Sequence, residues 1–269
     1  CHLRLTEIPK RQFIEYKNRN HMKTITTLFS LALLLASSMS FASTWSVYEV
    51  QVKQSDAPAV AAALDKFMQS DVGKSMPGGV HLNATVFGGT SQATHAFVLL
   101  FPDLATQMSW QATVPTTEAG QEFGAAMEAM AVPVANWTNS MIKVWGTPSN
   151  KDRFHQVTRF YTTDPLAVLA AQDKLMADPS MAAFPGQVGL SQTAIGNRLG
   201  ANGAYTSHVF TVGFESVEEM ENWGNYLNTQ PAWGEYLQAM STIATFMGTE
   251  LVTNAAVYDA KMDLETFLK

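Results

Sequence analysis

The chain has 269 residues, of which 46% are hydrophobic, and it carries a net charge of −6. The part from Ser43 onward is more acidic still, since six of the basic residues and only two of the acidic ones precede it. An acidic surface repels phosphate backbones, so nucleic acid is not an expected partner. The only cysteine, Cys1, lies upstream of Ser43, so we expect no disulfide, no thiolate nucleophile and no cysteine metal site in the part that follows.

The N-terminal stretch has the composition of a targeting segment rather than of a folded domain. Residues 1–21 are polar, basic and aperiodic, and we interpret them as an upstream extension. Residues 22–42 have a basic start, an apolar run over Leu28–Leu35 and small residues at the end, as a secretory signal peptide does. A membrane anchor is the alternative, but it needs roughly 20 apolar residues and this run is shorter. We predict cleavage after Ala42, a periplasmic or secreted location, and no membrane span.

From residue 43 to residue 146 the pattern predicts strand, helix, strand, strand, helices and strand. Strands are indicated by alternation of apolar and polar residues, helices by apolar residues at helical spacing, and turns by glycine and proline. The expected elements are strand Trp45–Lys53, helix Pro58–Ser70, strands Val80–Phe87 and Thr94–Phe101, a helix from Pro102 through Trp110, a helix from Thr117 to Asn136 kinked at Pro133, and strand Ser140–Trp145.

The same series of elements is repeated in the second part of the chain. Asp65-Lys66-Phe67-Met68 matches Asp173-Lys174-Leu175-Met176, and Pro-Gly, Val, Thr and Gly positions follow at the same spacing. A slightly longer spacing then pairs His95 with His208 and Trp110 with Trp223, and the change falls in a glycine-rich turn, where an insertion is tolerated best. We predict a tandem duplication with repeat 1 at residues 43–146, a linker at 147–152, and repeat 2 with a C-terminal tail at 153–269.

This element order, present twice, resembles the ferredoxin-like unit. Two such units in one chain resemble the dimeric α/β-barrel superfamily, in which the sheets of two units face each other. The resemblance implies an α+β fold, with the two units forming an intrachain pseudo-dimeric α/β barrel. Members include cofactor-independent monooxygenases, haem-degrading monooxygenases, chlorite dismutases, and binding or stress proteins. Fold alone does not choose among these functions.

Alternation along the strands indicates which side chains point between the sheets. In a ferredoxin-like sheet the apolar face is covered by helices, so the mixed face is the interior or an open surface. Buried polar groups on such a face need partners or a ligand. The alternative is a hydrated sheet face carrying a Glu–Arg pair. The predicted ligand-binding residues are Glu49, Gln51, Asn83, Thr85, His155, Arg159 and Thr193.

Two histidines begin apolar strands and are candidates for the rim of a pocket. His95 and His208 are in phase with the phenylalanines of their strands, which is expected of the helix-covered face. The alternative role is to tie the start of the strand to a nearby loop. No histidine stands at ligand spacing from another, and no acidic residue completes a set, so no metal site is predicted.

Three functions are compatible with these observations. The first is an exported binding protein for a small, partly apolar molecule with a carboxylate that Arg159 could hold. The second is an oxygenase of the barrel type, working without a cofactor or with haem; the first function requires no cofactor. The third is a structural or interaction protein whose Met- and Trp-rich helices form a docking surface. Serine-nucleophile, P-loop and Rossmann motifs are absent.

Overall fold

The computed structural model describes residues 43–89, 91–196 and 205–268. The predicted upstream extension and signal peptide lie outside the described residues, as does most of the glycine-rich turn after Gly196. Within the described ranges, no helix combines the length and the apolar character needed to cross a bilayer.

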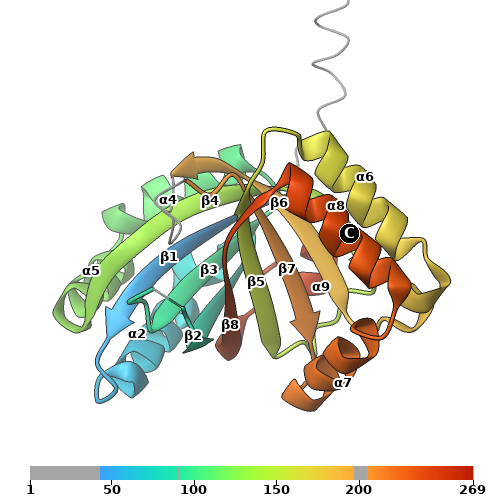
Figure 1. Cartoon of the computed structure of the whole chain (residues 1–269). Helices are drawn as coiled ribbons and strands as arrows, with labels where there is room; N and C mark the ends of the chain where they lie inside the picture. Colours follow the sequence, from blue (N-terminus) through green and yellow to red (C-terminus); the bar gives the residue numbers. More distant parts are fainter. Residues whose placement is uncertain (1–42, 90, 197–204, 269) are drawn as a thin grey trace, which may run out of the picture. The chain divides into compact units, whose positions relative to one another are not determined.

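The first half of the barrel contains four strands and the helices that cover them (Figure 1). Its helices begin where a side chain accepts a hydrogen bond from a first-turn N–H: Asp103 caps one and Thr117 another. The elements are β1 (Thr44–Val52), α2 (Ala57–Gln69), α3 (Asp71–Lys74), β2 (Gly79–Phe87), β3 (His95–Phe101), α4 (Leu104–Thr113), the short 3-10 helix η1 (Val114–Thr116), α5 (Glu118–Met130) and β4 (Ala131–Gly146).

The second half has the same order of strands and ends in one additional short helix. Asp164 and Ser216 cap its helices in the way that Asp103 and Thr117 do in the first half. The elements are β5 (Phe154–Tyr161), α6 (Pro165–Met176), the 3-10 helix η2 (Pro179–Ala183), β6 (Gln187–Gly196), β7 (His208–Phe214), α7 (Val217–Leu227), α8 (Pro231–Ile243), β8 (Thr245–Tyr258) and α9 (Leu264–Phe267).

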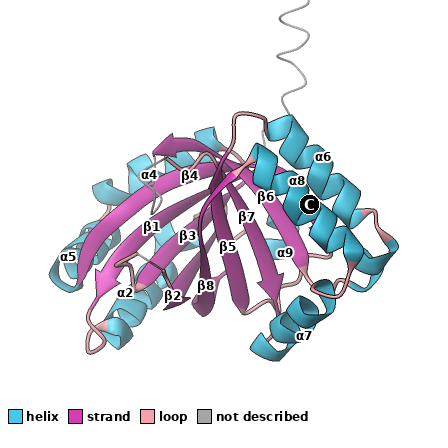
Figure 2. Cartoon of the chain, in the orientation of Figure 1, coloured by secondary structure: helices cyan, strands magenta, loops and turns pink. Residues whose placement is uncertain are grey.

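The eight strands form one closed antiparallel barrel, in the order β1-β3-β2-β8-β5-β7-β6-β4. Each half contributes a sheet whose first strand is central, flanked by its third and fourth strands. The two sheets join edge to edge, β2 with β8 and β4 with β6, because β4 and β8 are long enough to pair on both sides. Closure satisfies the backbone groups that open edges would expose. The longer helices lie outside the strands in Figure 2, whereas α9 packs against the interior cluster.

The boundary between α5 and β4 differs from the prediction of a helix that continues to Asn136 with a kink at Pro133. The helix ends at Met130, and β4 begins at Ala131. Pro133 lies where the register between β1 and β4 shifts, next to Val50, so its missing N–H removes no regular ladder bond. Among the described strands, only β1 pairs with this first part of β4, which makes it an edge that tolerates proline.

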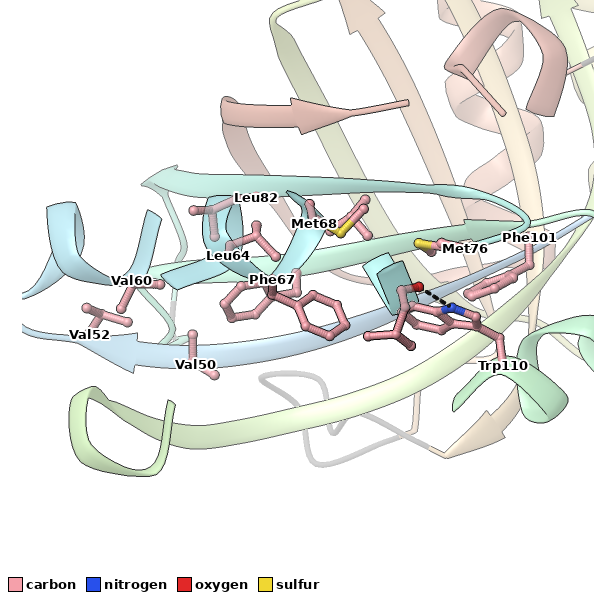
Figure 3. Packing of buried hydrophobic residues seen from close by; sticks show 13 residues of the cluster. Val50, Val52, Val60, Leu64, Phe67, Met68, Met76, Leu82, Phe101 and Trp110 are labelled. Carbon is pink, nitrogen blue, oxygen red and sulfur yellow. Dashed lines mark hydrogen bonds between the residues drawn. The ribbon is translucent and has the colours of Figure 1, made fainter. Parts of the chain in front are cut away.

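Each sheet buries its outer face under its own helices. In the first half, α2 places Val60, Leu64 and Phe67 against apolar side chains of the strands, as Figure 3 shows. Trp110 packs in the same cluster and its Nε1 donates to the carbonyl of Val72 at 3.2 Å. Trp223 is buried in the cluster of the second half. Both tryptophans therefore have the core-packing role expected of amphipathic helices.

Two glycines in α5 provide a matched test of helix packing. A Cβ at Gly120 would lie 1.9 Å from the carbonyl oxygen of Val114, whereas one at Gly124 would meet nothing within 4 Å. We expect Gly120→Ala to lower the free energy of unfolding by about 1–3 kcal/mol through overpacking. Gly124→Ala should raise it by up to about 1 kcal/mol through helix propensity. Urea denaturation of both variants measures this, and equal effects would contradict the packing of α5 on η1.

Candidate ligand site inside the barrel

The interior of the barrel contains a cavity of about 90 Å³. The alternation predicted for the first strand holds, because Val47 and Glu49 face the cavity while Tyr48 and Val50 face the helices. Since a water needs about 10–15 Å³ of such space, the cavity has room for several waters or one small molecule. Side chains from all eight strands line it, together with Leu264, Phe267 and Leu268 from the C-terminal segment.

A buried ion cluster crosses the interior. Arg159 of β5 places Nη1 at 2.5 Å from Glu250 Oε1 and Nη2 at 3.4 Å from Glu49 Oε1. All three side chains are less than 10% exposed, so water screens them little. The guanidinium also lies over the ring of Trp137, with 5.1 Å between Cζ and the ring centroid. The cation is therefore held by two carboxylates and one aromatic face.

Glu49 and Arg159 occupy equivalent positions in the two halves. Glu49 pairs with Ala96, the residue after His95, and Arg159 pairs with Val209, the residue after His208. The register of β1 against β4 shifts directly after Glu49, and that of β5 against β8 shifts directly after Arg159. One position of the repeated pattern thus carries opposite charges in the two halves.

A second polar group lines the cavity near the start of β5. His81, Asn83, His155 and Gln187 are all less than 10% exposed. Each has a buried polar atom that finds no hydrogen-bond partner among the described residues: Nε2 of the two histidines, Oδ1 of Asn83 and Oε1 of Gln187. Burial lowers the pKa of His155 to about 4, His81 adds to the lowering, and Asn254 opposes it. His155 is therefore neutral at pH 7.

Just outside the cavity lining, the carboxyl group of Asp152 is buried at the start of the second half. Asp152 is 2% exposed, and its Oδ2 fills the space above Gly213, where a Cβ would approach it to 2.3 Å. Burial, together with the charges of Glu219 and Glu215, raises the pKa of Asp152 to about 7. This carboxyl is therefore half protonated near neutral pH.

The remaining cavity wall is apolar. Trp45, Val47, Ala96 and Leu100 pack with Phe267 and Leu268, which place the C-terminal segment against the interior cluster. Trp45 Nε1 donates to Ser191 Oγ at 2.9 Å, so the indole is satisfied within the wall. A ligand in this cavity would meet polar groups on one side and hydrocarbon on the other.

The structure brings five of the predicted ligand-binding residues to the cavity and leaves two outside it. Those in the lining are Glu49, Asn83, Thr85, His155 and Arg159. Gln51 is exposed beyond the end of the cavity. Thr193 is half-buried and donates to Asn139 Oδ1 at 3.1 Å, away from the lining.

The two predicted rim histidines face the helix-covered side instead of the cavity. His95 Nδ1 lies 3.0 Å from Thr94 Oγ1, and His208 Nδ1 lies 2.9 Å from Ser207 Oγ. The ring of His208 stacks on Phe160 with 5.6 Å between centroids. Burial lowers the pKa of both imidazoles. These contacts match the alternative role, in which each histidine secures the start of its strand.

Sequence reasoning missed three contributors to the site. His81 precedes Asn83 by two residues on the same strand, so strict alternation places it on the same face and could have found it. Glu250 lies on β8, and the sequence pattern did not show where this strand begins, so the face on which Glu250 lies could not be predicted. The role of Phe267 in closing the interior depends on where a short terminal helix docks, and no local pattern encodes that.

The side chains of the described residues determine whether the protein could hold a metal ion or a haem. No group of three or more His, Cys, Asp or Glu in the described ranges is arranged to hold a metal ion. Cavities of about 670 and 540 Å³ between the sheets and their helices have the size of sites for larger organic ligands. Among the described residues, their linings contain no histidine or cysteine, the usual imidazole and thiolate ligands of haem iron. They fit haem in volume, and the side chains they offer as axial ligands are methionines and tyrosines, such as Met181, Met220 and Tyr236.

Solved structures share this fold. The chain resembles a candidate monooxygenase from Fusobacterium nucleatum with a TM-score of 0.59 and 10% identity, covering 82% of this chain and 96% of that one. A candidate monooxygenase from Lactobacillus acidophilus gives a TM-score of 0.56, 10% identity, and 81% and 97% coverage. An anthrone oxidase-like protein gives a TM-score of 0.50 and 12% identity, covering 82% of this chain and 94% of that one. No protein-family model and no curated protein matches the sequence.

The chain thus has the fold of the dimeric α/β-barrel superfamily, built from one polypeptide. No narrower family is assigned by identities this low.

Proposed function

We propose that this protein is an exported binding protein that takes a small, partly apolar molecule inside its barrel. The observation that carries the proposal is the set of buried polar atoms without hydrogen-bond partners that belong to residues lining the cavity. Unpaired polar groups are costly in a protein interior, and native structures satisfy them with protein, water or ligand. A cavity that served packing alone would be expected to be apolar.

The test fills the cavity without disturbing the strand. Gly189 lines the cavity, and a Cβ placed there would have its nearest neighbour, Met141 Cε, at 3.5 Å. We expect native mass spectrometry of the purified chain to show a bound small molecule that Gly189→Val loses. Gly124→Ala, on the open face of α5, is the control and should keep it. Interior binding is refuted if the parent carries no molecule and if no small compound raises the melting temperature of the parent above that of Gly189→Val treated in the same way.

A second candidate is oxidation of a small molecule without a bound cofactor. It is favoured by the cavities of about 670 and 540 Å³ between the sheets and their helices, which have the size for an aromatic substrate, and by the resemblance to candidate monooxygenases and an anthrone oxidase-like protein. Oxygen consumption with anthrone as substrate tests this activity. Haem titration followed by absorbance separates the haem-dependent version, because only a bound haem shifts the spectrum.

We further infer that the two halves arose by tandem duplication, with boundaries near residues 146 and 153, and that the chain is processed after Ala42. The duplication is supported by equal strand order and by register shifts at equivalent positions. Processing is supported by the apolar run that precedes Ala42. N-terminal sequencing of exported protein is expected to begin at Ser43; a start at Cys1 or Met22 would contradict export by this route.

A further inference from the structure

The unpaired groups of the cavity require a ligand that can donate hydrogen bonds. Asn83 Oδ1 and Gln187 Oε1 are amide oxygens, which accept and do not donate. Neutral His155 has one accepting and one donating ring nitrogen; its Nε2 makes no close hydrogen bond in the described part of the chain, and the imidazole also interacts with the side chain of Asn254. A hydroxyl both donates and accepts, so it can satisfy an amide oxygen and an imidazole together.

The charge balance of the interior disfavours an anionic ligand. Arg159 is the only Lys or Arg in the cavity lining, and it already contacts Glu49 and Glu250. A ligand carboxylate would add a third negative charge to a site with one cation, and burying an uncompensated charge is strongly unfavourable. Among small molecules, neutral ones are therefore preferred over the carboxylate that the sequence suggested.

The cavity also sets the size and the apolar part of the ligand. Val98, Val157 and Val252 line it without polar atoms, and its volume is about 90 Å³. An engineered cavity of about 150 Å³ in another protein holds benzene, so this smaller one suits a molecule smaller than benzene, such as a short-chain alcohol.

We infer that the barrel interior selects neutral, hydroxyl-bearing small molecules, such as a short-chain alcohol, through Asn83, His155 and Gln187. This selectivity rests on the proposed function and narrows it to one chemical class. The hydroxyl lies among the three polar side chains, and the hydrocarbon part packs against the valines.

Isothermal titration with 2-propanol, acetate and acetone tests the inference on the full-length mature chain. The three probes are similar in size, and only 2-propanol is a neutral hydrogen-bond donor. We expect 2-propanol to bind at least about tenfold tighter than either of the others. Asn83→Leu should weaken 2-propanol binding by about tenfold and leave acetone binding unchanged or tighter. Asn225→Leu, on the exposed surface of α7, is the matched control and should behave as the parent.

The outcomes separate the two proposals. Preferred binding of acetate, or equal binding of 2-propanol and acetone, overturns the hydroxyl selectivity and leaves interior binding intact. Failure of all three probes to bind the parent, with Gly189→Val equally inert, overturns both. If Asn83→Leu does not fold, the ranking of the three probes on the parent still decides the selectivity.

Discussion

Replacing Arg159 with alanine should lower the free energy of unfolding by roughly 3–5 kcal/mol, the cost of leaving buried charges without their partner. Arg159 holds Glu250 at 2.5 Å and Glu49 at 3.4 Å, and all three side chains are buried. Without the guanidinium, two carboxylates would remain in one poorly hydrated space. Glu49→Gln should cost less, because the amide still hydrogen-bonds to Arg159.

Urea denaturation at pH 7 measures these effects. The matched control is Lys174→Ala, which breaks an ion pair with Glu235 at 2.9 Å whose partners are 76% and 63% exposed. Exposed pairs contribute about 0–1 kcal/mol, so this variant should stay close to the parent. The triple variant Arg159→Met, Glu49→Gln, Glu250→Gln should recover much of the loss, since it removes the charges together. Equal stability of Arg159→Ala and Lys174→Ala would show that the cluster is solvated.

Asp152→Asn should make the protein more stable at pH 8 and have little effect near pH 4. The carboxyl has an ordinary pKa of 3.8 and a folded pKa of about 7. Between these values the folded chain keeps a proton that the unfolded chain releases, so the free energy of unfolding falls as pH rises and is level above the window. At about 1.4 kcal/mol per pKa unit, the loss is on the order of 2–4 kcal/mol.

The amide cannot ionise, so the variant avoids this loss above neutral pH. Urea unfolding of parent and variant at pH 4, 6 and 8 follows the difference, which should grow with pH. Asp65→Asn, on the exposed face of α2, is the control and should not reproduce the trend. A difference that is constant with pH would mean that the Asp152 carboxyl ionises normally in the folded protein.

Much of the architecture could be predicted because strands and helices differ in the local spacing of their apolar residues. The alternation of β1 placed Glu49 inside and Val50 outside. The end of α5 was predicted wrongly because Ala131-Val132-Pro133-Val134 is apolar at both helical and strand spacing. What decides its state is pairing with β1, a contact between residues far apart in the chain.

The site was predicted in part for the same reason. Periodicity gives the face of a residue and not its position along the barrel, so Gln51 was placed on the cavity face but lies past the cavity's end. Glu250 reaches Arg159 only because β8 pairs with β5 and also closes the barrel against β2. Such register is set by the assembled sheet, and a single strand does not encode it.

The position shared by Glu49 and Arg159 has a consequence for how such an interior can evolve. In a homodimer with a two-fold axis through the barrel, every residue near the axis meets its own copy, so glutamate would face glutamate. Trp137 pairs with Val47, and Glu250 pairs with Val157 at the corresponding position of the other half. This second position also carries a different residue in each half. Covalent linkage of the halves releases both positions from that identity. An attractive pair can then replace a repulsive one. The two sides of the cavity can also acquire different residues, which suits an asymmetric ligand.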